Sequence, residues 1–154
     1  MTDDVSLRLR AADADDARRL LEWRNDAATR LQSLTREEID LPTHRAWLAR
    51  RLADPDCALF IVEHGGRPVG QVRLDRSAFD VEVSVGLAAE VRGQGLGARS
   101  LRAAEAELLS RWPEVTRLTA VVRKQNATSL RLFAGVGFEE ASSDHEVVHL
   151  VKRL

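Results

Sequence analysis

The chain has 154 residues, of which 23 are basic and 24 acidic, and a formal net charge of −1 at pH 7. This balance excludes a protein that binds nucleic acid through a strongly basic surface, because the basic residues are interleaved with acidic ones. No apolar run approaches the roughly 20 residues that a membrane span requires. We therefore expect one domain over residues 1–154, with neither a nucleic-acid nor a membrane partner.

The acidic start at residues 1–5 lacks the basic and apolar segments of a signal peptide. A single cysteine, Cys57, excludes an internal disulfide and fits a reducing compartment. Both features predict a cytoplasmic protein.

The first third of the chain has one strand pattern and two helix patterns. Residues 6–10 alternate apolar and polar side chains, which predicts a half-buried strand. Residues 13–23 carry apolar side chains at helical spacing, and we expect Asp13 to cap this first helix. A second helix is expected to start with Thr43 as its cap and to end at Pro55.

The middle of the chain has strand patterns. Residues 58–62 form a short apolar run and residues 69–74 alternate, with Gly65 and Gly66 between the two segments. This arrangement predicts a β-hairpin. A further strand is expected at about residues 79–87.

The last third returns to a helix pattern after a glycine-rich stretch. Small or apolar side chains recur at i, i+4, i+7 and i+11 along a helix, and they are Gly97, Leu101, Ala104 and Leu108. Pro113 stops this helix, residues 118–122 predict a strand, and Asn126 is the expected cap of a short helix. Phe138 and residues 145–151 supply the last strands. The order predicts an α/β or α+β domain, with a mixed sheet of about six to seven strands flanked by about four helices.

The glycine-rich stretch at residues 90–98 lies between a predicted strand and a predicted helix. Its sequence is Glu-Val-Arg-Gly-Gln-Gly-Leu-Gly-Ala. Glycines allow positive φ angles and let a ligand approach the backbone closely. The free N–H groups at the following helix start favour phosphate oxygens. The stretch therefore predicts a site for a diphosphate-bearing cofactor.

One such cofactor is a dinucleotide, because Gly93-x-Gly95-x-x-Ala98 fits a relaxed dinucleotide fingerprint. Two features oppose it: the loop lies several residues past the strand, and the following strand ends in Arg123-Lys124 rather than in a carboxylate for a ribose hydroxyl. That basic pair suits a phosphorylated ribose, so an NADP-type dinucleotide-binding protein stays open as an alternative.

The spacing Arg92-x-x-Gly95-x-Gly97 resembles the pyrophosphate-binding signature of the GNAT superfamily of acetyl-CoA-dependent N-acetyltransferases. Residues 126–138, an asparagine followed by a short helix and a Gly-Phe pair, are similar to the second GNAT signature. The order of elements also matches the GNAT fold over essentially the whole chain. The resemblance implies a GNAT-like fold, acetyl-CoA as co-substrate and no metal.

The resemblance also implies a set of cofactor-binding residues. The backbone from Val85 to Leu87 would lie beside the pantetheine arm, where the strand splays from its parallel neighbour. An unpaired N–H there, that of Leu87, would polarise the thioester carbonyl. The full set is Val85, Leu87, Val91, Arg92, Gly93, Gln94, Gly95, Leu96, Gly97, Ala98, Asn126 and Ser129.

Glu82 is the candidate catalytic base. An amine that attacks a thioester must lose a proton, and a carboxylate can accept it directly or through a water. On the predicted strand, Glu82 and Ser84 share one face, opposite to the flanking valines. Many GNAT enzymes use a glutamate on the equivalent strand. The alternative is that Glu82 simply faces solvent from a half-buried sheet.

Phe133 departs from the family pattern. Many relatives carry at this position a tyrosine whose hydroxyl is taken to reprotonate the CoA thiolate, and this chain has no tyrosine. We assign Phe133 to packing and assign no general acid. A non-catalytic GNAT-like domain that binds acetyl-CoA stays open as a further alternative.

The acceptor side of the cleft is expected in the two N-terminal helices. The Trp-Arg-Asn-Asp element and the following His-x-x-Trp look like a GNAT branch that includes acetyltransferases of nucleotide-linked amino sugars, near to ribosomal-protein N-terminal acetyltransferases. The residues concerned are Trp23, Arg24, Asn25, Arg30, Ser33, His44 and Trp47, with Ser84 on the strand. We expect the primary amine of an amino-sugar nucleotide, a peptide N-terminus or a small molecule as acceptor, and homodimers are common among look-alikes. The alternative for the tryptophans is a place in the core.

Overall fold

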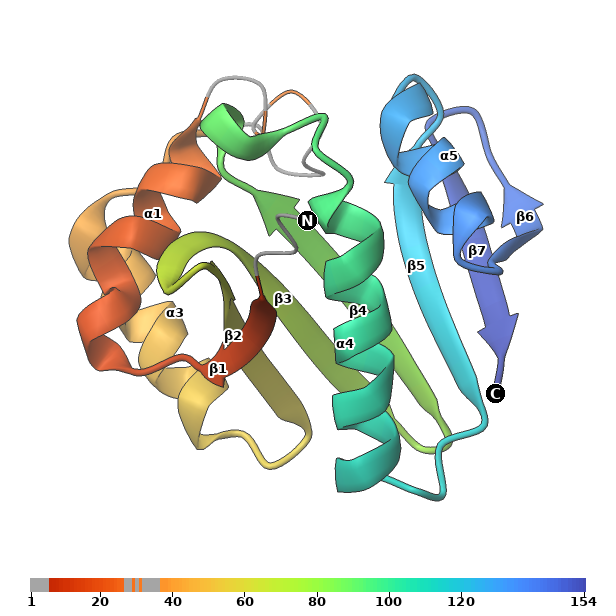
Figure 1. Ribbon diagram of the computed structural model, residues 1–154, viewed down its shortest axis with the longest axis horizontal. Coiled ribbons are helices and arrows are strands. Elements are labelled where there is room, and N and C mark those ends of the chain that lie inside the picture. The colour runs from red at the N-terminus through yellow and green to blue at the C-terminus, as the bar shows by residue number, and fades with distance from the viewer. Residues whose placement is uncertain (1–5, 27–28, 30, 32–36) are drawn as a thin grey trace, which may run out of the picture.

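The computed structural model describes residues 6–26, 29, 31 and 37–154, which form one mixed sheet with helices on both faces (Figure 1). The strands, in the spatial order β1-β2-β3-β4-β5-β7-β6, are β1 (Leu7–Ala11), β2 (Cys57–His64), β3 (Arg67–Ser77), β4 (Asp80–Leu87), β5 (Arg117–Arg123), β6 (Glu139–Ser143) and β7 (Val147–Arg153). The α-helices are α1 (Ala17–Asn25), α3 (Leu41–Ala53), α4 (Leu96–Arg111) and α5 (Ala127–Gly135). Short 3-10 helices at Ala14–Asp16 and Ala89–Val91 precede α1 and α4.

The predicted fold class is confirmed, since seven strands and four α-helices are found in the described part of the chain. The predicted stripe of α4 is buried at all four of its positions. The predicted cap of α3 is wrong. Asp40, not Thr43, caps this helix, because the Asp40 carboxylate accepts the Thr43 N–H at 2.8 Å. Pro42 lies in the first turn, where its fixed φ and missing N–H are tolerated.

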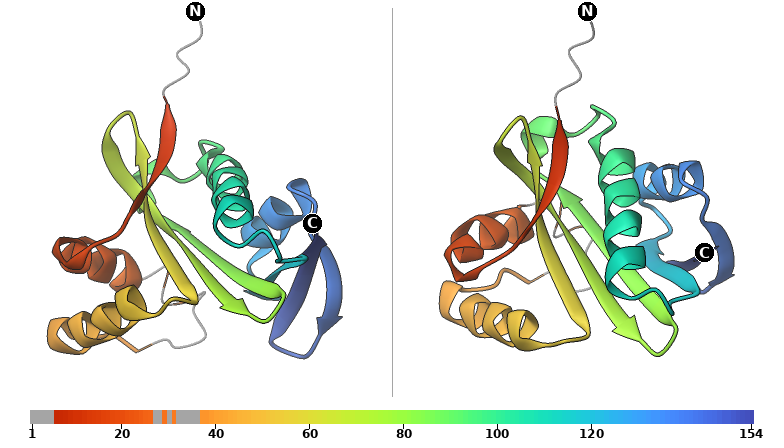
Figure 2. Two further views of the ribbon diagram at one scale, coloured as in Figure 1. Left: turned by 90° about the horizontal axis from the view of Figure 1, so that it is seen from below. Right: turned by 60° about the horizontal axis from the view of Figure 1, so that its bottom comes forward.

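The two faces of the sheet carry separate cores. Figure 2 shows α1 and α3 on one face and α4 and α5 on the other. Strand β2 is buried on both faces: Phe60 and Val62 belong to the core under α4, whereas Leu59 and Ile61 belong to the core under α1 and α3. This double burial explains why residues 58–62 are apolar without alternation.

Strands β4 and β5 form a short parallel ladder and then diverge. Their register is Asp80↔Arg117, Val81↔Leu118 and Glu82↔Thr119, so the ladder ends at Glu82. The upper ends of the two strands stand apart in Figure 1, and α4 and α5 begin at this end of the sheet. This is the splay that the family resemblance implied.

The divergence leaves backbone donors of β4 facing the gap. The Ala88 N–H donates to the Val69 carbonyl at 2.8 Å, on the β3 side. N–H groups alternate between the two sides of a strand, so those of Val85 and Leu87 point away from β3 and toward β5. Because the β4–β5 ladder has already ended, these N–H groups point into the gap between the two strands.

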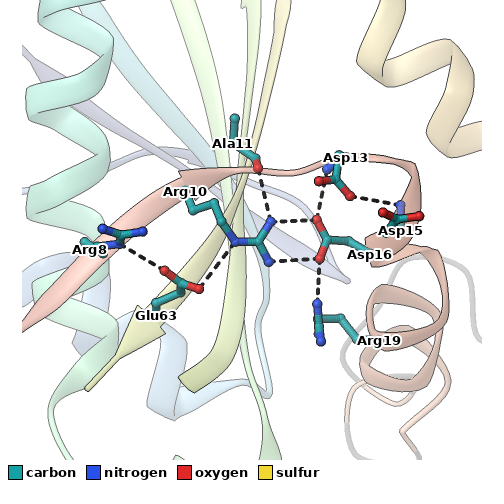
Figure 3. Close-up of polar contacts among 8 residues, drawn as sticks. All are labelled: Arg8, Arg10, Ala11, Asp13, Asp15, Asp16, Arg19 and Glu63. Carbon is teal, nitrogen blue, oxygen red and sulfur yellow. Dashed lines mark hydrogen bonds and ion pairs between the residues drawn. The ribbon is translucent and has the colours of Figure 1, made fainter. Parts of the chain in front are cut away.

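Asp16 fixes the start of α1 against the sheet (Figure 3). Its carboxylate is 2% exposed and accepts two hydrogen bonds from the Arg10 guanidinium, both at 2.9 Å. Arg19 donates to the same carboxylate at 2.6 Å, and the Asp13 N–H also donates to it, at 2.9 Å. Asp13, the predicted cap of the first helix, caps the short 3-10 helix before α1 and forms a capping box with Asp16, which is itself the N-cap residue of α1. One carboxylate therefore joins the end of β1 to the first turn of the helix that follows.

None of the described helices is long and apolar enough to cross a membrane.

Candidate active site

The glycine loop (residues 90–97) is exposed up to Gly95, the residue at which α4 begins. Gly93 and Gly95 have φ angles of 81° and 75°, and Gly95 is the N-cap of α4. A Cβ at either position would have no neighbour within 4 Å, so the backbone conformation rather than space requires glycine here. No side chain caps α4, which leaves the N–H groups of its first turn to an anion. A diphosphate fits this end of the helix.

Gly97 brings α4 close to α5. A Cβ at Gly97 would lie 2.9 Å from the Leu132 Cδ2, so the absence of a side chain permits this approach. At the start of α5, the Asn126 side chain accepts the Ser129 N–H at 3.2 Å, which confirms the predicted cap. The two helix starts thus lie on the same end of the sheet, beside the gap between β4 and β5 (Figure 1).

Several predicted cofactor residues turn their side chains into the core. Leu96 is 2% exposed, and Val85, Leu87 and Val91 pack against the core under α4. These residues offer a ligand mainly their backbone. The Gln94 amide donates to the Glu90 carbonyl at 3.5 Å and so stays within the loop.

Arg92 joins the glycine loop to the end of α1. Its Nε donates to the Leu87 carbonyl at 3.2 Å, and its Nη2 donates to Asp26 at 3.2 Å and to the Thr29 hydroxyl at 3.1 Å. The backbone N–H of Thr29 and the Arg92 guanidinium hold the pKa of Asp26 below its usual value. Arg92 therefore lies between the expected cofactor site and the helices on the other face.

A cavity of about 320 Å³ lies between helices α1 and α3 and strands β2 to β4, and we call it the α1/α3 cavity. Its lining includes Trp23 and Arg24 of α1, both predicted on the acceptor side. It also includes His44 and Trp47 of α3. Gly86 and Leu87 close one end, so the cavity meets β4 where the strand has parted from β5.

Two other predicted acceptor residues lie outside this lining. The Asn25 side chain donates to the Ile39 carbonyl at 2.8 Å and accepts the Ile39 N–H at 3.0 Å. Its amide thereby joins the end of α1 to the segment before α3. Ser84 is half-buried opposite Arg73 in the β3–β4 ladder. Arg30 and Ser33 lie outside the described residues.

Glu82 is exposed at the last pair of the β4–β5 ladder. Val81 and Val83 are buried under α4, so Glu82 faces the α1/α3 side, as the alternation predicted. It is not part of the cavity lining. Gly86 lies four positions further along the strand, which corresponds to roughly 13 Å in an extended conformation. Glu82 is therefore outside direct hydrogen-bond reach of this end of the cavity.

His44 is a titratable group within the lining. It is 5% exposed and stacks on Trp47 with ring centroids 5.4 Å apart, and its Nε2 has no hydrogen-bond partner. Burial, followed by the charge of Arg24, lowers the pKa of His44 from its ordinary value. The imidazole is therefore neutral at pH 7 and adds no charge to the cavity.

Sequence reasoning missed five polar residues of the lining: Thr29, Thr43, Arg50, Gln71 and Arg73. Gln71 and Arg73 alternate with buried residues of β3, a pattern that also describes a strand face turned to water. Only the packing of α1 and α3 over this face makes it the wall of a cavity.

No group of three or more His, Cys, Asp or Glu side chains suited to a metal ion is found among the described residues. Cys57 is buried and forms no disulfide.

The structure combines a mixed sheet, a strand pair that parts at one end, and beside it a helix start without a side-chain cap. The acetyltransferase (GNAT) domain family matches residues 6–139. The chain belongs to this family, and it is an acetyl-CoA-dependent N-acetyltransferase.

Solved structures share this fold at low sequence identity. An aminoglycoside acetyltransferase, AAC(6')-Ib in complex with ribostamycin and coenzyme A, is 23% identical with a TM-score of 0.81, over 96% of this chain and 93% of that chain. A spermidine N-acetyltransferase, a SpeG chimera from Vibrio cholerae and hSSAT, is 17% identical with a TM-score of 0.84, over 96% of this chain and 95% of that chain. YncA, a putative acetyltransferase from Salmonella typhimurium with acetyl-CoA, is 22% identical with a TM-score of 0.80, over 97% of this chain and 94% of that chain. None of the curated proteins compared with the chain matches it.

Proposed function

We propose that the protein transfers acetyl from acetyl-CoA to a primary amine by direct attack, with the amine bound in the α1/α3 cavity. One observation carries this proposal: the cavity meets β4 at Gly86 and Leu87, beyond the end of the β4–β5 ladder. An amine in the cavity and a thioester in the gap would meet at this point. Acetyl-CoA supplies an acyl group on a thiol leaving group, and an amine displaces it without a covalent enzyme intermediate.

The backbone supports the donor side of the reaction. The first turn of α4, with Gly93 and Gly95, binds the diphosphate through N–H groups and the helix dipole. Arg92 adds a positive charge beside the loop. The Leu87 N–H donates to the thioester carbonyl and stabilises the negative charge that develops on its oxygen.

Glu82 is the proposed base and accepts the proton of the amine through a chain of waters. No general acid is proposed. Phe133 is 4% exposed and packs edge-to-face on Phe138 with centroids 5.0 Å apart, which supports a packing role. A thiolate, with a solution pKa of about 8.5, leaves without a protonating side chain.

Binding of acetyl-CoA tests the donor site directly. Calorimetry of the purified protein is expected to show binding of acetyl-CoA and none of NADPH under identical conditions. The diphosphate alone suits both ligands, but the family match favours the acetyltransferase over the dinucleotide-binding alternative. Binding of NADPH alone, or of neither ligand, would contradict the proposed function.

Glu82→Gln is expected to lower kcat/KM for acetyl transfer by about 100-fold at pH 7, because the amide cannot accept the proton. The loss is expected to shrink as pH rises, since more of the amine is then already deprotonated. CoA release over a pH series measures the effect. Glu139→Gln, the same change on an exposed position of β6, is the control and keeps wild-type activity. Equal rates for Glu82→Gln and wild type at every pH would remove Glu82 from the mechanism.

The acceptor classes expected from the sequence are kept in this proposal: an amino-sugar nucleotide, a peptide N-terminus or a small amine. A cytoplasmic location and a homodimer stay predictions.

A further inference from the structure

The charged side chains among the described residues that line the α1/α3 cavity are all arginines. Its lining contains Arg24, Arg50 and Arg73, and no Asp or Glu stands among the described residues that line it. His44 is neutral at pH 7, because burial lowers its pKa. A ligand in this cavity therefore meets guanidinium groups without a competing carboxylate on the wall.

The carboxylates beside Arg73 lie outside the lining of the cavity. Asp75 accepts from the Arg73 Nε at 2.8 Å and is also ion-paired with Arg51, which in turn pairs with Asp54 at 3.8 Å. Burial and the charge of Arg51 lower the pKa of Arg73, although Cys57 and Glu82 act in the opposite direction. Arg73 therefore lies in the wall of the cavity while its partner Asp75 lies outside it, and a guanidinium in such a wall suits an anion.

The cavity also has an aromatic and apolar wall. Trp23 and Trp47 line it together with Leu20 and Leu59, and the Arg73 guanidinium lies over the Trp47 ring, 5.6 Å from its centroid. Tryptophan faces suit the flat or apolar body of a small molecule. The wall therefore leaves the arginines to recognise one end of such a molecule.

Arg73 is set apart from the end of the cavity where acetyl is delivered. In the β3–β4 register, Gln71 lies opposite Gly86 and Arg73 opposite Ser84. The two-residue step places Arg73 roughly 7 Å along the sheet from Gly86. An acceptor that spans the cavity reaches Gly86 with one end and Arg73 with the other.

We propose that the acceptor is a primary amine that also carries an anionic group, a phosphate or a carboxylate, held by Arg50 and Arg73. This inference rests on the proposed function, because it assumes that the amine binds in the α1/α3 cavity. Polyamines and aminoglycosides are polycations at neutral pH and are repelled by this lining. The protein therefore differs in acceptor class from the spermidine and aminoglycoside acetyltransferases whose fold it shares.

Turnover of four amines tests the acceptor class, with acetyl-CoA saturating. Glucosamine 6-phosphate provides a phosphate and 4-aminobutyrate a carboxylate, whereas glucosamine is the match without an anionic group and spermidine is the polycation. At least one anionic amine is expected to exceed glucosamine in kcat/KM by about tenfold or more, with spermidine lowest. The stronger of the two anionic amines identifies the anionic group.

Two arginines of α3 form a matched pair of variants. Arg50 and Arg45 are both exposed on this helix, but only Arg50 lines the cavity. Arg50→Gln is expected to reduce the preference for the anionic amine about tenfold, whereas Arg45→Gln leaves it unchanged. Calorimetry provides a readout that needs no turnover: pyrophosphate and citrate are titrated into protein already saturated with CoA, so that the start of α4 is filled. Arg50→Gln is expected to weaken this binding about tenfold.

The outcomes separate the two proposals. The anionic acceptor is overturned if glucosamine or spermidine is acetylated as fast as the anionic amines. It is also overturned if Arg50→Gln and Arg45→Gln have equal effects. Both results leave the proposal of acetyl transfer in place. Failure of acetyl-CoA to bind overturns the proposed function itself. When none of the four amines is acetylated, the calorimetry decides: anion binding that depends on Arg50 supports the inference, and absence of anion binding overturns it.

Discussion

Asp16→Ala is expected to lower the free energy of unfolding by about 3–5 kcal/mol, the usual cost of breaking a buried ion pair by removing one partner. The Arg10 side chain is only 28% exposed, and it would lose both of its hydrogen bonds to Asp16. The Asp13 N–H and Arg19 would lose an acceptor at the same time. Urea denaturation at pH 7 measures the loss.

Asp15→Ala is the matched control for this variant. It removes the same charge from the adjacent residue, whose carboxylate is exposed, and is expected to cost no more than about 1 kcal/mol through the helix dipole. If the free energies of unfolding of Asp16→Ala and Asp15→Ala differ by less than about 1 kcal/mol, the ion-pair network of Figure 3 adds little stability.

The effect of Asp16→Ala is expected to depend on pH in a defined direction. Burial alone would raise the pKa of Asp16, but hydrogen bonds from Arg10, the Asp13 N–H and Arg19 hold it below 3.8. A carboxylate whose pKa is lower in the folded state stabilises the fold above its unfolded-state pKa, and this contribution is lost as pH falls through the folded-state value. Wild type and Asp16→Ala should therefore converge in stability as pH falls below the unfolded-state pKa and through the lower folded-state pKa.

Gly95→Val is expected to raise KM for acetyl-CoA by 100-fold or more, or to abolish binding. Gly95 has a φ of 75° at the N-cap of α4, a conformation that a β-branched residue adopts only under strain. To relieve this strain the loop must move, and the N–H groups of the first turn then no longer converge on the diphosphate. Calorimetry with acetyl-CoA and steady-state kinetics both measure the effect.

Gly66→Val separates backbone strain from loss of the ligand site. Gly66 lies in the β2–β3 turn with a φ of 79°, and a Cβ there would also have no neighbour within 4 Å. The two variants are therefore expected to lose similar stability, about 1–3 kcal/mol, while only Gly95→Val loses its affinity for acetyl-CoA. Wild-type affinity for acetyl-CoA in Gly95→Val would place the diphosphate elsewhere.

Local signals predicted most of the secondary structure. The stripe of α4, the cap Asn126 and the turn at Gly65 and Gly66 depend on residues close together in the sequence, and each is present. The cap of α3 was mistaken because Asp40 and Thr43 both fit an N-cap, and the choice depends on where Pro42 falls in the first turn. The catalytic role of Glu82 stays a prediction, since the structure shows its face and exposure but no substrate.

The sequence by itself determined the fold class, the glycine loop and the family, because each of these is written in contiguous segments whose spacing fixes backbone conformation and helix starts. Only the tertiary structure decided which arginines are structural and which line a cavity. Arg8 and Glu63 pair across 55 positions of the chain, and Arg73 shares Asp75 with Arg51 of another element. Charge compensation depends on which side chains the fold brings within a few ångströms, and no local pattern in a chain of interleaved arginines and carboxylates encodes that distance.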